Sequence, residues 1–281
     1  MPFRLHSAPA TFQRLIDRII GQDLEPYCFA YLDDIIILGK SFEHHRELLR
    51  EVFRRLREAN LRLNPEKCQF GRKSLKYLGH LVTSEGIRTD PDKVSAIVDL
   101  APPTNLRGLR RFLGMASWYR RYIEGFSKIT APLNRLLKKG QRWQWTAEQD
   151  KAFCELKQHL TEAPVLTCPD FEQPFILQTD ASDLGLGVAL TQNIEGNDQV
   201  IAYASRSLTS CEKAYSTTEK ECLAIVWGIE KMRPYLEGYH FTVLTDHQSL
   251  KWLRTLKNPS GRLARWQMSL QQYSFDIKYR K

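Results

Sequence analysis

Two adjacent aspartates interrupt an apolar stretch near the start of the chain. Asp33 and Asp34 follow Cys28-Phe29-Ala30-Tyr31-Leu32 and precede Ile35-Ile36-Ile37-Leu38. Runs of this length rich in β-branched and aromatic residues predict strands, and a short polar interruption between them predicts a tight hairpin. Burying two carboxylates is costly unless something compensates them, and a hairpin tip with paired carboxylates suits Mg²⁺. An ordinary acidic turn is the alternative, because turns favour Asp in any case.

The segments around this pair favour the metal site. They are Met1-Pro2-Phe3-Arg4-Leu5, Ala8-Pro9-Ala10-Thr11-Phe12-Gln13-Arg14, Tyr31-Leu32-Asp33-Asp34, Asn64-Pro65-Glu66-Lys67-Cys68 and Tyr77-Leu78-Gly79-His80. In this order and spacing they resemble the palm of retroelement reverse transcriptases. The likeness continues to the last residue, and the whole chain resembles part of the Pol polyprotein of gypsy-type LTR retrotransposons. Continuous coverage of this kind is more specific than any single motif.

The resemblance implies a role for residues of this first part. Asp33 and Asp34 would be catalytic and would hold Mg²⁺, for which Mn²⁺ can substitute. Seven residues would lie at the nucleotide or primer: Phe3, Gln13, Tyr31, Lys67, Leu78, Gly79 and His80. The partners implied are an RNA template, a DNA primer and a dNTP. The pattern of apolar residues predicts helices over 10–20 and 42–60, and short strands over 61–63 and 77–82.

The basic charge of the chain is concentrated in residues 101–145. This segment contains ten Lys or Arg and one acid, Glu124, so its charge equals the +9 of the whole chain. Trp and Tyr are interleaved with the cations, a pattern typical of contact with a nucleic-acid backbone. A solvated basic helix face is the alternative. The position after a palm-like segment favours binding by Arg107, Arg110, Arg111, Arg120, Arg121, Lys138 and Lys139.

The same segment resembles the thumb of retroelement polymerases. After Ala101-Pro102-Pro103, Thr104 is a candidate N-cap for a helix that buries Leu109 and Leu113 and leaves its arginines displaced. Thr146-Ala147-Glu148-Gln149 fits a capping box, and the helix it starts would bury Phe153, Leu156 and Leu160. Pro164, Pro169 and Pro174 then mark a linker. The predicted boundaries are 1–84 (palm), 85–145 (thumb and connection), 146–173 (helix and linker) and 174–281.

The last segment has the element order of an RNase H fold. Strands are predicted over 175–179, 186–192, 200–205, 241–245 and 275–279, with helices over 215–236 and 262–272. Thr179-Asp180-Ala181-Ser182, Ser216-Thr217-Thr218-Glu219-Lys220-Glu221 and Leu244-Thr245-Asp246-His247 resemble the motifs of the gypsy-type version. The fold class expected is therefore a multidomain α+β and α/β chain. It would hold a partial reverse transcriptase palm and thumb, then a truncated RNase H-like domain with a mixed sheet.

Three carboxylates of this segment are expected to converge. Asp180 and Asp246 end apolar strands, and Glu221 shares a helix face with Ala224, Ile225 and Gly228, whereas Glu219 does not. Three such carboxylates suit two Mg²⁺ ions about 4 Å apart, as in hydrolysis of the RNA strand of an RNA–DNA hybrid. The bland alternatives are a turn acid, an exposed helix charge and a helix N-cap. The matched order favours Asp180, Glu221 and Asp246 as catalytic metal ligands.

Both sites are expected to be incomplete. Reverse transcriptases carry a further catalytic aspartate upstream of the first motif and a fingers subdomain, and the related nucleases carry a fourth acid downstream. Asp276 is no replacement, because alternation with Phe275 and Ile277 places it on the wet face of a strand. The family activity is RNA-directed DNA polymerisation coupled to removal of RNA, and this chain is expected to be impaired in it. A non-catalytic nucleic-acid-binding remnant of a retrotransposon is the rival hypothesis.

Composition argues against other classes of protein. No apolar stretch approaches the roughly 20 residues that a membrane span needs, and no charged-then-apolar leader opens the chain. The six cysteines form no C-x-x-C pair, which argues against a zinc site or a disulfide framework. We expect an intracellular protein, in a cytoplasmic particle or the nucleus, that is not secreted. The rest of the Pol polyprotein would be a partner.

Overall fold

The computed structural model describes residues 6–247 and 261–280. The chain forms two compact units, Met1–Leu78 and Gly79–Lys281. In the described part of the chain, no helix is both long and apolar enough to cross a membrane. The segment boundaries expected at 84, 145 and 173 stay predictions.

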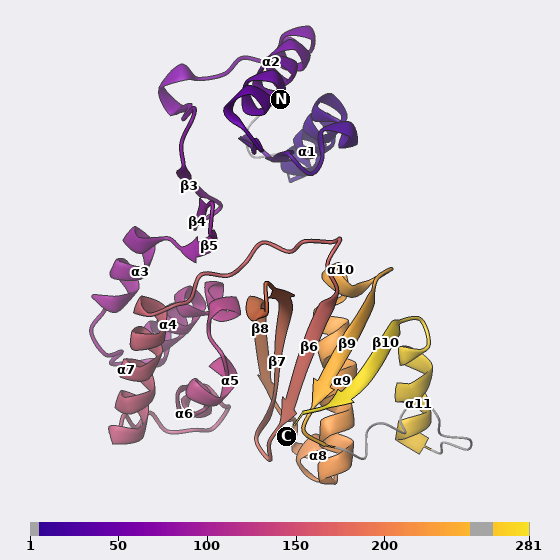
Figure 1. Ribbon diagram of the computed structural model, residues 1–281. Helices are drawn as coiled ribbons and strands as arrows, with labels where there is room; N and C mark the ends of the chain where they lie inside the picture. The colour runs from indigo at the N-terminus through magenta and orange to yellow at the C-terminus, as the bar shows by residue number, and fades with distance from the viewer. Residues whose placement is uncertain (1–5, 248–260, 281) are drawn as a thin grey trace. The chain divides into compact units, whose positions relative to one another are not determined.

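The first unit packs two helices on a β-hairpin (Figure 1). Its elements are α1 (Ala8–Ile20), η1 (Gln22–Leu24), β1 (Cys28–Tyr31), β2 (Asp34–Ile37), α2 (Phe42–Glu58), η2 (Pro65–Lys67) and β3 (Ser74–Tyr77). Ile16 and Ile20 of α1 and Val52 and Leu56 of α2 are buried in one cluster with Cys28 of β1. Burial of these apolar faces is the main source of stability in a unit of this size. Both predicted helices and the hairpin are confirmed.

The strand predicted over 61–63 is wrong. Asn60 has a φ of 55°, and the amides of Asn60 and Leu61 donate to the carbonyls of Arg57 and Leu56. This pair of bonds is the Schellman motif that ends a helix at a left-handed residue. Because the Leu61 amide already caps α2, it is not available to a sheet ladder. The segment then runs irregularly to η2, where Asn64 Oδ1 accepts from the Glu66 amide.

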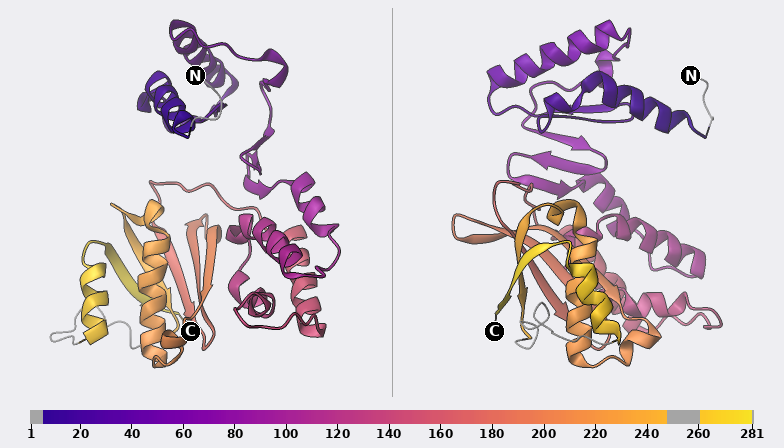
Figure 2. Two further views of the ribbon diagram at one scale, coloured as in Figure 1. Left: turned by 180° about the vertical axis from the view of Figure 1, so that it is seen from behind. Right: turned by 90° about the vertical axis from the view of Figure 1, so that its right-hand side faces the viewer.

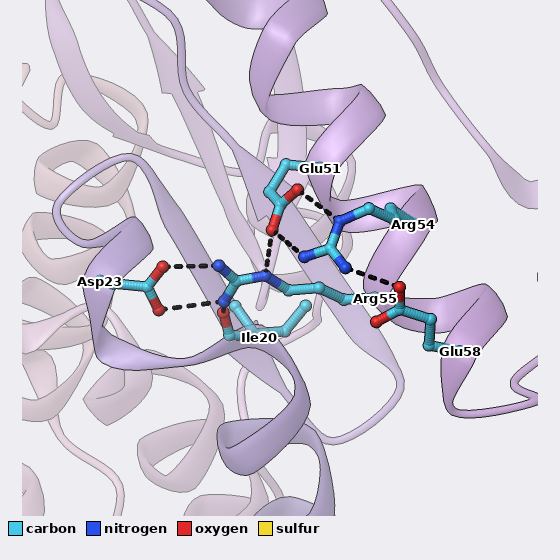
Figure 3. A network of polar contacts seen from close by, with 6 residues as sticks. All are labelled: Ile20, Asp23, Glu51, Arg54, Arg55 and Glu58. Atoms are coloured by element: carbon cyan, nitrogen blue, oxygen red, sulfur yellow. Dashed lines mark hydrogen bonds and ion pairs between the residues drawn. The ribbon is translucent and has the colours of Figure 1, made fainter.

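A polar network joins the end of α1 to α2 (Figure 3). The Arg55 guanidinium donates to Asp23 Oδ2 at 2.5 Å, to Glu51 Oε1 at 2.7 Å and to the carbonyl of Ile20. Its side chain is only 17% exposed, whereas that of Arg54, which pairs with Glu51 and Glu58, is 54% exposed. Hydrogen bonds to a half-buried charge contribute more than solvent-exposed ion pairs. Arg55 therefore fixes the angle between the two helices more strongly than Arg54 does.

The second unit begins with a hairpin and a helical cluster. Its elements here are β4 (His80–Thr83), β5 (Gly86–Thr89), α3 (Pro91–Val98), α4 (Leu106–Trp118), η3 (Arg120–Tyr122), α5 (Phe126–Ile129), α6 (Ala131–Leu136) and α7 (Ala147–Thr161). Leu109, Phe112, Leu133, Phe153 and Leu156 lie in its core. The predicted buried stripe of α7 and its capping box at Thr146 are confirmed.

Two expectations for the region from residue 77 to α4 need correction, and one helix there was not predicted. The single strand over 77–82 is interrupted by a turn, because Leu78 and Gly79 both have positive φ, 49° and 78°. Asn105, not Thr104, caps α4, since its Oδ1 accepts from the Gly108 amide at 2.8 Å. The helix α3 was not predicted, although Asp90 followed by Pro91 is a typical N-cap and first helical residue.

The linker after α7 is hydrogen-bonded to β5 on one side and to Val200, in the strand that follows residue 196, on the other. The amide and carbonyl of Leu166 exchange hydrogen bonds with Ile87, and the Thr167 amide donates to the carbonyl of Val200. The prolines at 164 and 169 flank this short bridged stretch. The segment is therefore irregular, with a single β-bridge at Leu166, between the helical cluster and the sheet that follows.

The last part is a five-stranded mixed sheet in the order β10-β9-β6-β7-β8. The strands are β6 (Phe175–Ala181), β7 (Gly185–Ile194), β8 (Asn197–Ser207), β9 (His240–Thr245) and β10 (Ser274–Tyr279), and the helices are α8 (Ser210–Lys213), α9 (Thr217–Lys231), α10 (Arg233–Leu236) and α11 (Gly261–Leu270). β9 is parallel to β6 and β10, and the other pairs are antiparallel. All five predicted strands are confirmed. The helix predicted over 215–236 is two helices, since Pro234 cannot continue α9.

Helix α9 covers one face of this sheet (Figures 1 and 2). Its close approach depends on Gly228, where an added Cβ would lie 2.7 Å from Val188 Cγ1 and 3.4 Å from Leu177 Cδ2. Interiors packed at this density do not absorb an extra methyl group without shifts. Gly228 thus sets the separation between α9 and the sheet.

We expect Gly228→Ala to destabilise the second unit by about 1–3 kcal/mol, the usual cost of overpacking a core. Gly114→Ala is the matched control, because it also replaces a helical glycine but its added Cβ has no neighbour within 4 Å. Helix propensity alone should make that control neutral or more stable by up to about 1 kcal/mol. Urea unfolding of both variants measures the difference. Equal stabilities would contradict the proposed contact.

Candidate active site

Two aspartates meet at one edge of the sheet because their strands are parallel neighbours. Gln178 of β6 lies opposite Leu244 of β9. Two residues further along both strands, the chain reaches Asp180 and Asp246, both of which are exposed. Thr179 and Thr245, the preceding residues, are buried. The alternation of a strand thus turns each aspartate away from the core at the same edge.

Glu221 approaches this edge from α9 and is almost fully buried, with 4% of its surface exposed. Its Oε1 accepts from the Ala181 amide at 3.2 Å, and its Oε2 has no hydrogen-bond partner among the described residues. Burial, with the nearby charges of Asp246 and Asp180, raises the pKa of Glu221 to about 7. By contrast, Glu219 caps its own helix at Ser216 and pairs with Arg262. The neighbouring acids on α9 therefore face different surroundings.

The donor chemistry of the three carboxylates suits a divalent cation, although their present spacing does not form a metal-binding group. A buried carboxylate oxygen without a partner and two negative neighbours is costly, and a bound cation would offset that cost. Carboxylate oxygens are also the ligands that Mg²⁺ and Mn²⁺ prefer. Within residues 6–247 and 261–280, no three His, Cys, Asp or Glu side chains are close enough to form a complete metal-binding group. Like-charged carboxylates repel one another, so a cation would have to draw these oxygens together.

The turn after Asp180 is held by residues that the sequence did not single out. The Lys220 ammonium, which is buried, donates to Asp183 Oδ1 at 2.7 Å and lowers the pKa of that carboxyl. Within the turn, the Ser182 hydroxyl accepts from the amides of Leu184 and Gly185. Lys220 directly precedes Glu221, so one stretch of α9 both supplies a carboxylate and holds the turn. Only this adjacency in the sequence could have indicated the contact.

The Asp33-Asp34 pair lies at the tip of the β1–β2 hairpin in the first unit. Tyr31 pairs with Asp34, so Leu32 and Asp33 form a two-residue turn in which Leu32 has a φ of 53°. Both aspartates are exposed. The Gln13 side chain supports the turn, since it accepts from the Leu32 amide at 2.6 Å and donates to the carbonyl of Ala30 at 3.0 Å. Gln13 thus holds the backbone of the hairpin that carries the carboxylates.

The other residues predicted near the nucleotide or primer lie in different environments. Tyr31 is 53% exposed, and Lys67 is exposed at the end of η2. Burial, with the charge of Asp34, raises the pKa of Tyr77, which places the end of β3 near the hairpin. Phe3 lies outside the described residues, and Leu78 is 38% exposed in its turn. The roles of these residues stay predictions.

Gly79 and His80 belong to the second unit and contact its helical cluster. The Tyr119 hydroxyl donates to the carbonyl of Gly79 at 3.0 Å, and the Tyr122 hydroxyl lies 2.9 Å from His80 Nδ1. The His80 ring is stacked with Trp118 at a centroid distance of 6.2 Å. Burial, with the positive charges of Arg121 and Lys93, lowers the pKa of His80. His80 is therefore held by the end of α4 and by η3.

Most of the predicted nucleic-acid-binding cations are exposed. These are Arg107, Arg110, Arg111, Arg120, Lys138 and Lys139. Arg121 differs, because it is half-buried and its Nε has no hydrogen-bond partner among the described residues. The apolar face of α4 is buried against α7, so its arginines lie on the opposite face. Whether these side chains bind nucleic acid stays a prediction.

Two family models match the chain at the two sites just described. Residues 1–82 match the family described as "Reverse transcriptase (RNA-dependent DNA polymerase)", and residues 170–273 match the "RNase H-like domain found in reverse transcriptase". Residues 1–82 and 170–273 thus match reverse transcriptase and RNase H-like domains in the order expected of a fragment of a retrotransposon Pol polyprotein. The resemblance inferred from the motifs is confirmed. Proteins of these families in general depend on divalent metal ions.

Relatives from animals and fungi align with the whole chain. It is 43% identical to the retrovirus-related Pol polyprotein from transposon 297 of Drosophila melanogaster, over 100% of the chain and 26% of the relative. It is 37% identical to the transposon Tf2-3 polyprotein of Schizosaccharomyces pombe, over 100% of the chain and 21% of the relative. The chain spans about a quarter of the length of such relatives.

Solved structures of the foamy viral protease-reverse transcriptase confirm the fold class. One, in complex with double-stranded DNA, matches with a TM-score of 0.86 and 24% identity over 98% of this chain and 49% of its own. Another, in complex with an RNA/DNA hybrid, matches with a TM-score of 0.85 and 25% identity over 100% of this chain and 39% of its own. The partial reverse transcriptase and RNase H-like architecture is therefore as expected.

The raised pKa of Glu221 predicts a pH-dependent cost to folding in the absence of metal. Because its pKa rises from 4.5 to about 7 on folding, the carboxyl destabilises the folded state progressively between these pH values. In EDTA, Glu221→Gln should be more stable than the parent by roughly 2–3 kcal/mol at pH 8, with the advantage gone near pH 4. Urea unfolding at several pH values measures this. Glu230→Gln, at an exposed position on α9, should show no such trend.

Proposed function

We propose that the Asp180, Glu221 and Asp246 edge hydrolyses the RNA strand of an RNA–DNA hybrid. The observation that carries the proposal is the convergence of two strand-end aspartates with a buried glutamate that lacks a partner for one oxygen. Two further findings support it. The RNase H-like family model covers all three residues, and one of the similar solved structures is a complex with an RNA/DNA hybrid.

In this proposal the three carboxylates would hold Mg²⁺, or Mn²⁺ in its place. A pair of such ions activates water and stabilises the leaving oxygen in phosphodiester hydrolysis. Asp180 and Asp246, which are exposed, would face the substrate, whereas Glu221, whose Oε1 accepts from the Ala181 amide, would supply the buried ligand. Lys220 and Asp183 would act as positioning residues, because they hold the turn that follows Asp180.

We propose further that the first unit contributes to RNA-directed DNA polymerisation. The exposed Asp33 and Asp34 would hold Mg²⁺ at the hairpin tip, with Gln13 fixing the turn beneath them. The RNA template, DNA primer and dNTP would be the substrates, and the rest of the Pol polyprotein a partner. An intracellular location is part of the same proposal.

Asp180→Asn should lower the single-turnover rate of RNA cleavage in a hybrid by at least about 100-fold, in Mg²⁺ and in Mn²⁺. The loss should exceed the 10–100-fold typical of residues that only support a metal ligand. The matched control is Asp276→Asn, which changes an exposed aspartate at the far edge of the same sheet. Hybrid cleavage that survives in Asp180→Asn but falls in Asp276→Asn would overturn the assignment. Absence of cleavage in the parent as well would favour the second candidate function.

That second candidate is nucleic-acid binding without catalysis, favoured by the exposed arginines of α4. Replacing Arg107, Arg110 and Arg111 with Gln should weaken hybrid binding. It should also lower the slope of log K against log salt by about 2–3, since each phosphate contact contributes about 0.9. The control is a triple Gln variant of Lys151, Lys213 and Lys231, exposed cations outside the basic segment. Equal slopes in the two variants would show that the α4 arginines are only a solvated face.

A further inference from the structure

The outer side of α2 combines arginines with exposed phenylalanines. Leu48 and Val52 of this helix are buried in the core of the first unit. With 3.6 residues per turn, five other positions fall within about 80° of the helix circumference, away from that core, and extend over about 22 Å. These five residues, all exposed, are called the α2 stripe: Phe42, Arg46, Arg50, Phe53 and Arg57.

The three arginines of the α2 stripe have no acidic partner in the described part of the chain. The adjacent arginines of the helix do have partners, since Arg54 pairs with Glu51 and Glu58, and Arg55 with Glu51 and Asp23 (Figure 3). The surrounding segment is basic as well, because residues 46–76 contain ten Lys or Arg and four Glu, an excess of +6. A row of guanidinium groups without partners favours a polyanionic ligand.

The phenylalanines of the α2 stripe lie among these arginines. Phe42 is 67% exposed and lies one turn from Arg46, and Phe53 lies between Arg50 and Arg57, three and four residues away. Phe53 also contacts Phe70, which is exposed too, edge to face at a centroid distance of 6.0 Å. Exposed rings in these positions distinguish the α2 stripe from an ordinary solvated helix face, which would carry charged and polar side chains alone.

The alternation of rings and cations decides which polyanion fits. An amphipathic helix of a protein partner needs a continuous apolar groove, whereas Phe42 and Phe53 are about 16 Å apart along the helix with arginines between them. A single strand of nucleic acid offers the matching pattern, because its phosphates alternate with bases whose faces are free to stack. In a duplex those faces are covered by neighbouring base pairs.

We propose that the α2 stripe binds a single-stranded nucleic acid. The guanidinium groups of Arg46, Arg50 and Arg57 bind phosphates, a contact that suits their planar set of donors. Phe42 and Phe53 stack on unpaired bases, and this contact is tolerant of sequence because every base has a π-face. The ligand class is therefore unpaired RNA or DNA of any sequence.

The site is separate from both groups of carboxylates. The buried side of α2 packs on the β1–β2 hairpin, so the α2 stripe faces away from the strands that carry Asp33 and Asp34. It would hold a different stretch of nucleic acid from the one presented to those carboxylates. A second contact of this kind raises the effective concentration of a strand that is already bound elsewhere on the chain.

The first test measures the affinity of the full chain for a fluorescein-labelled oligo(dT) of about 15 nucleotides, by anisotropy at several salt concentrations. Combined Arg46→Gln, Arg50→Gln and Arg57→Gln should lower the slope of log K against log salt by about 2, since each phosphate contact to a single strand contributes about 0.7. Gln has a helix propensity close to that of Arg, so α2 should remain folded.

The matched control is the triple Gln variant of Lys151, Lys213 and Lys231, which removes the same charge from exposed positions outside the α2 stripe. Its slope should stay close to that of the parent. Equal slopes in the arginine and lysine variants would show that the α2 stripe binds no strand. Both should be repeated in the Arg107, Arg110 and Arg111 variant, where the same difference is expected if the α2 stripe acts independently of α4.

The second test separates stacking from apolar contact at Phe42. Phe42→Leu removes the ring but keeps an apolar side chain, and should weaken oligo(dT) binding by about 5–10-fold. Phe42→Tyr keeps the ring and should change binding less than about 2-fold. Neither should alter the affinity for a fully paired duplex of the same length. If Phe42→Leu binds oligo(dT) as the parent does, the proposed stacking is wrong and the site is rejected.

A polyglutamate peptide tests the other class of polyanion. If the arginine variant loses affinity for this peptide and keeps its affinity for oligo(dT), the α2 stripe is a surface for an acidic protein and the proposal fails. These outcomes are independent of the nuclease assignment, which depends on the loss of hybrid cleavage in Asp180→Asn. Cleavage can therefore persist or disappear without changing what the α2 variants show.

Discussion

The contact of α9 with the sheet at Gly228 is the constraint on which the site formed by Asp180, Glu221 and Asp246 depends. Because no side chain separates the helix from Val188 and Leu177, α9 lies close enough to bury Glu221 beside two strand ends. The same closeness makes that burial costly. Desolvation and two neighbouring aspartates raise the pKa of Glu221, and one of its oxygens has no partner in the described structure. Packing energy thus holds a carboxylate that is poorly compensated in the described structure, which is typical of functional sites.

The first unit, Met1–Leu78, also positions two carboxylates, but it does so without burying them. Its two carboxylates are exposed on a tight turn, so the requirement there is a fixed backbone and not a buried charge. Gln13 meets this requirement by bonding to the backbone on both sides of Tyr31. Arg55 in turn joins the end of α1, the helix that carries Gln13, to α2. Polar contacts therefore tie α1 both to α2 and to the hairpin tip.

Segments of the connection and of the linker that precede the five-stranded sheet also bond to it. Leu166 bridges to β5, Thr167 bonds to β8, and Ser127 bonds to a β8 side chain. These contacts cover an edge strand, which would otherwise present unpaired backbone groups. The bond of Ser127 also places Lys128, a lysine of the basic segment, in the lining of a small cavity that includes Asp180. The basic segment of residues 101–145 thus contributes a side chain near Asp180 as well as the exposed arginines of α4.

The sequence alone indicated the resemblance to reverse transcriptase and RNase H domains, the order of the five strands of the sheet and the three acids that are proposed as metal ligands, because these depend on local patterns. The alternation of apolar and polar residues predicted the five strands, and the capping box at Thr146 predicted the start of α7. The helix face shared with Gly228 distinguished Glu221, which is buried, from Glu219. The wrong predictions also concerned local features of the chain. The Leu61 amide bonds within a helix cap and not within a strand, and Asn105, not Thr104, caps α4. The helix predicted over 215–236 is divided in two at Pro234. Only the tertiary structure brought Lys128 to the sheet face near Asp180, tied Lys220 to Asp183 and raised the pKa of Glu221. Contacts between distant segments, and the desolvation they cause, depend on how the elements pack and leave no periodic signal in the sequence.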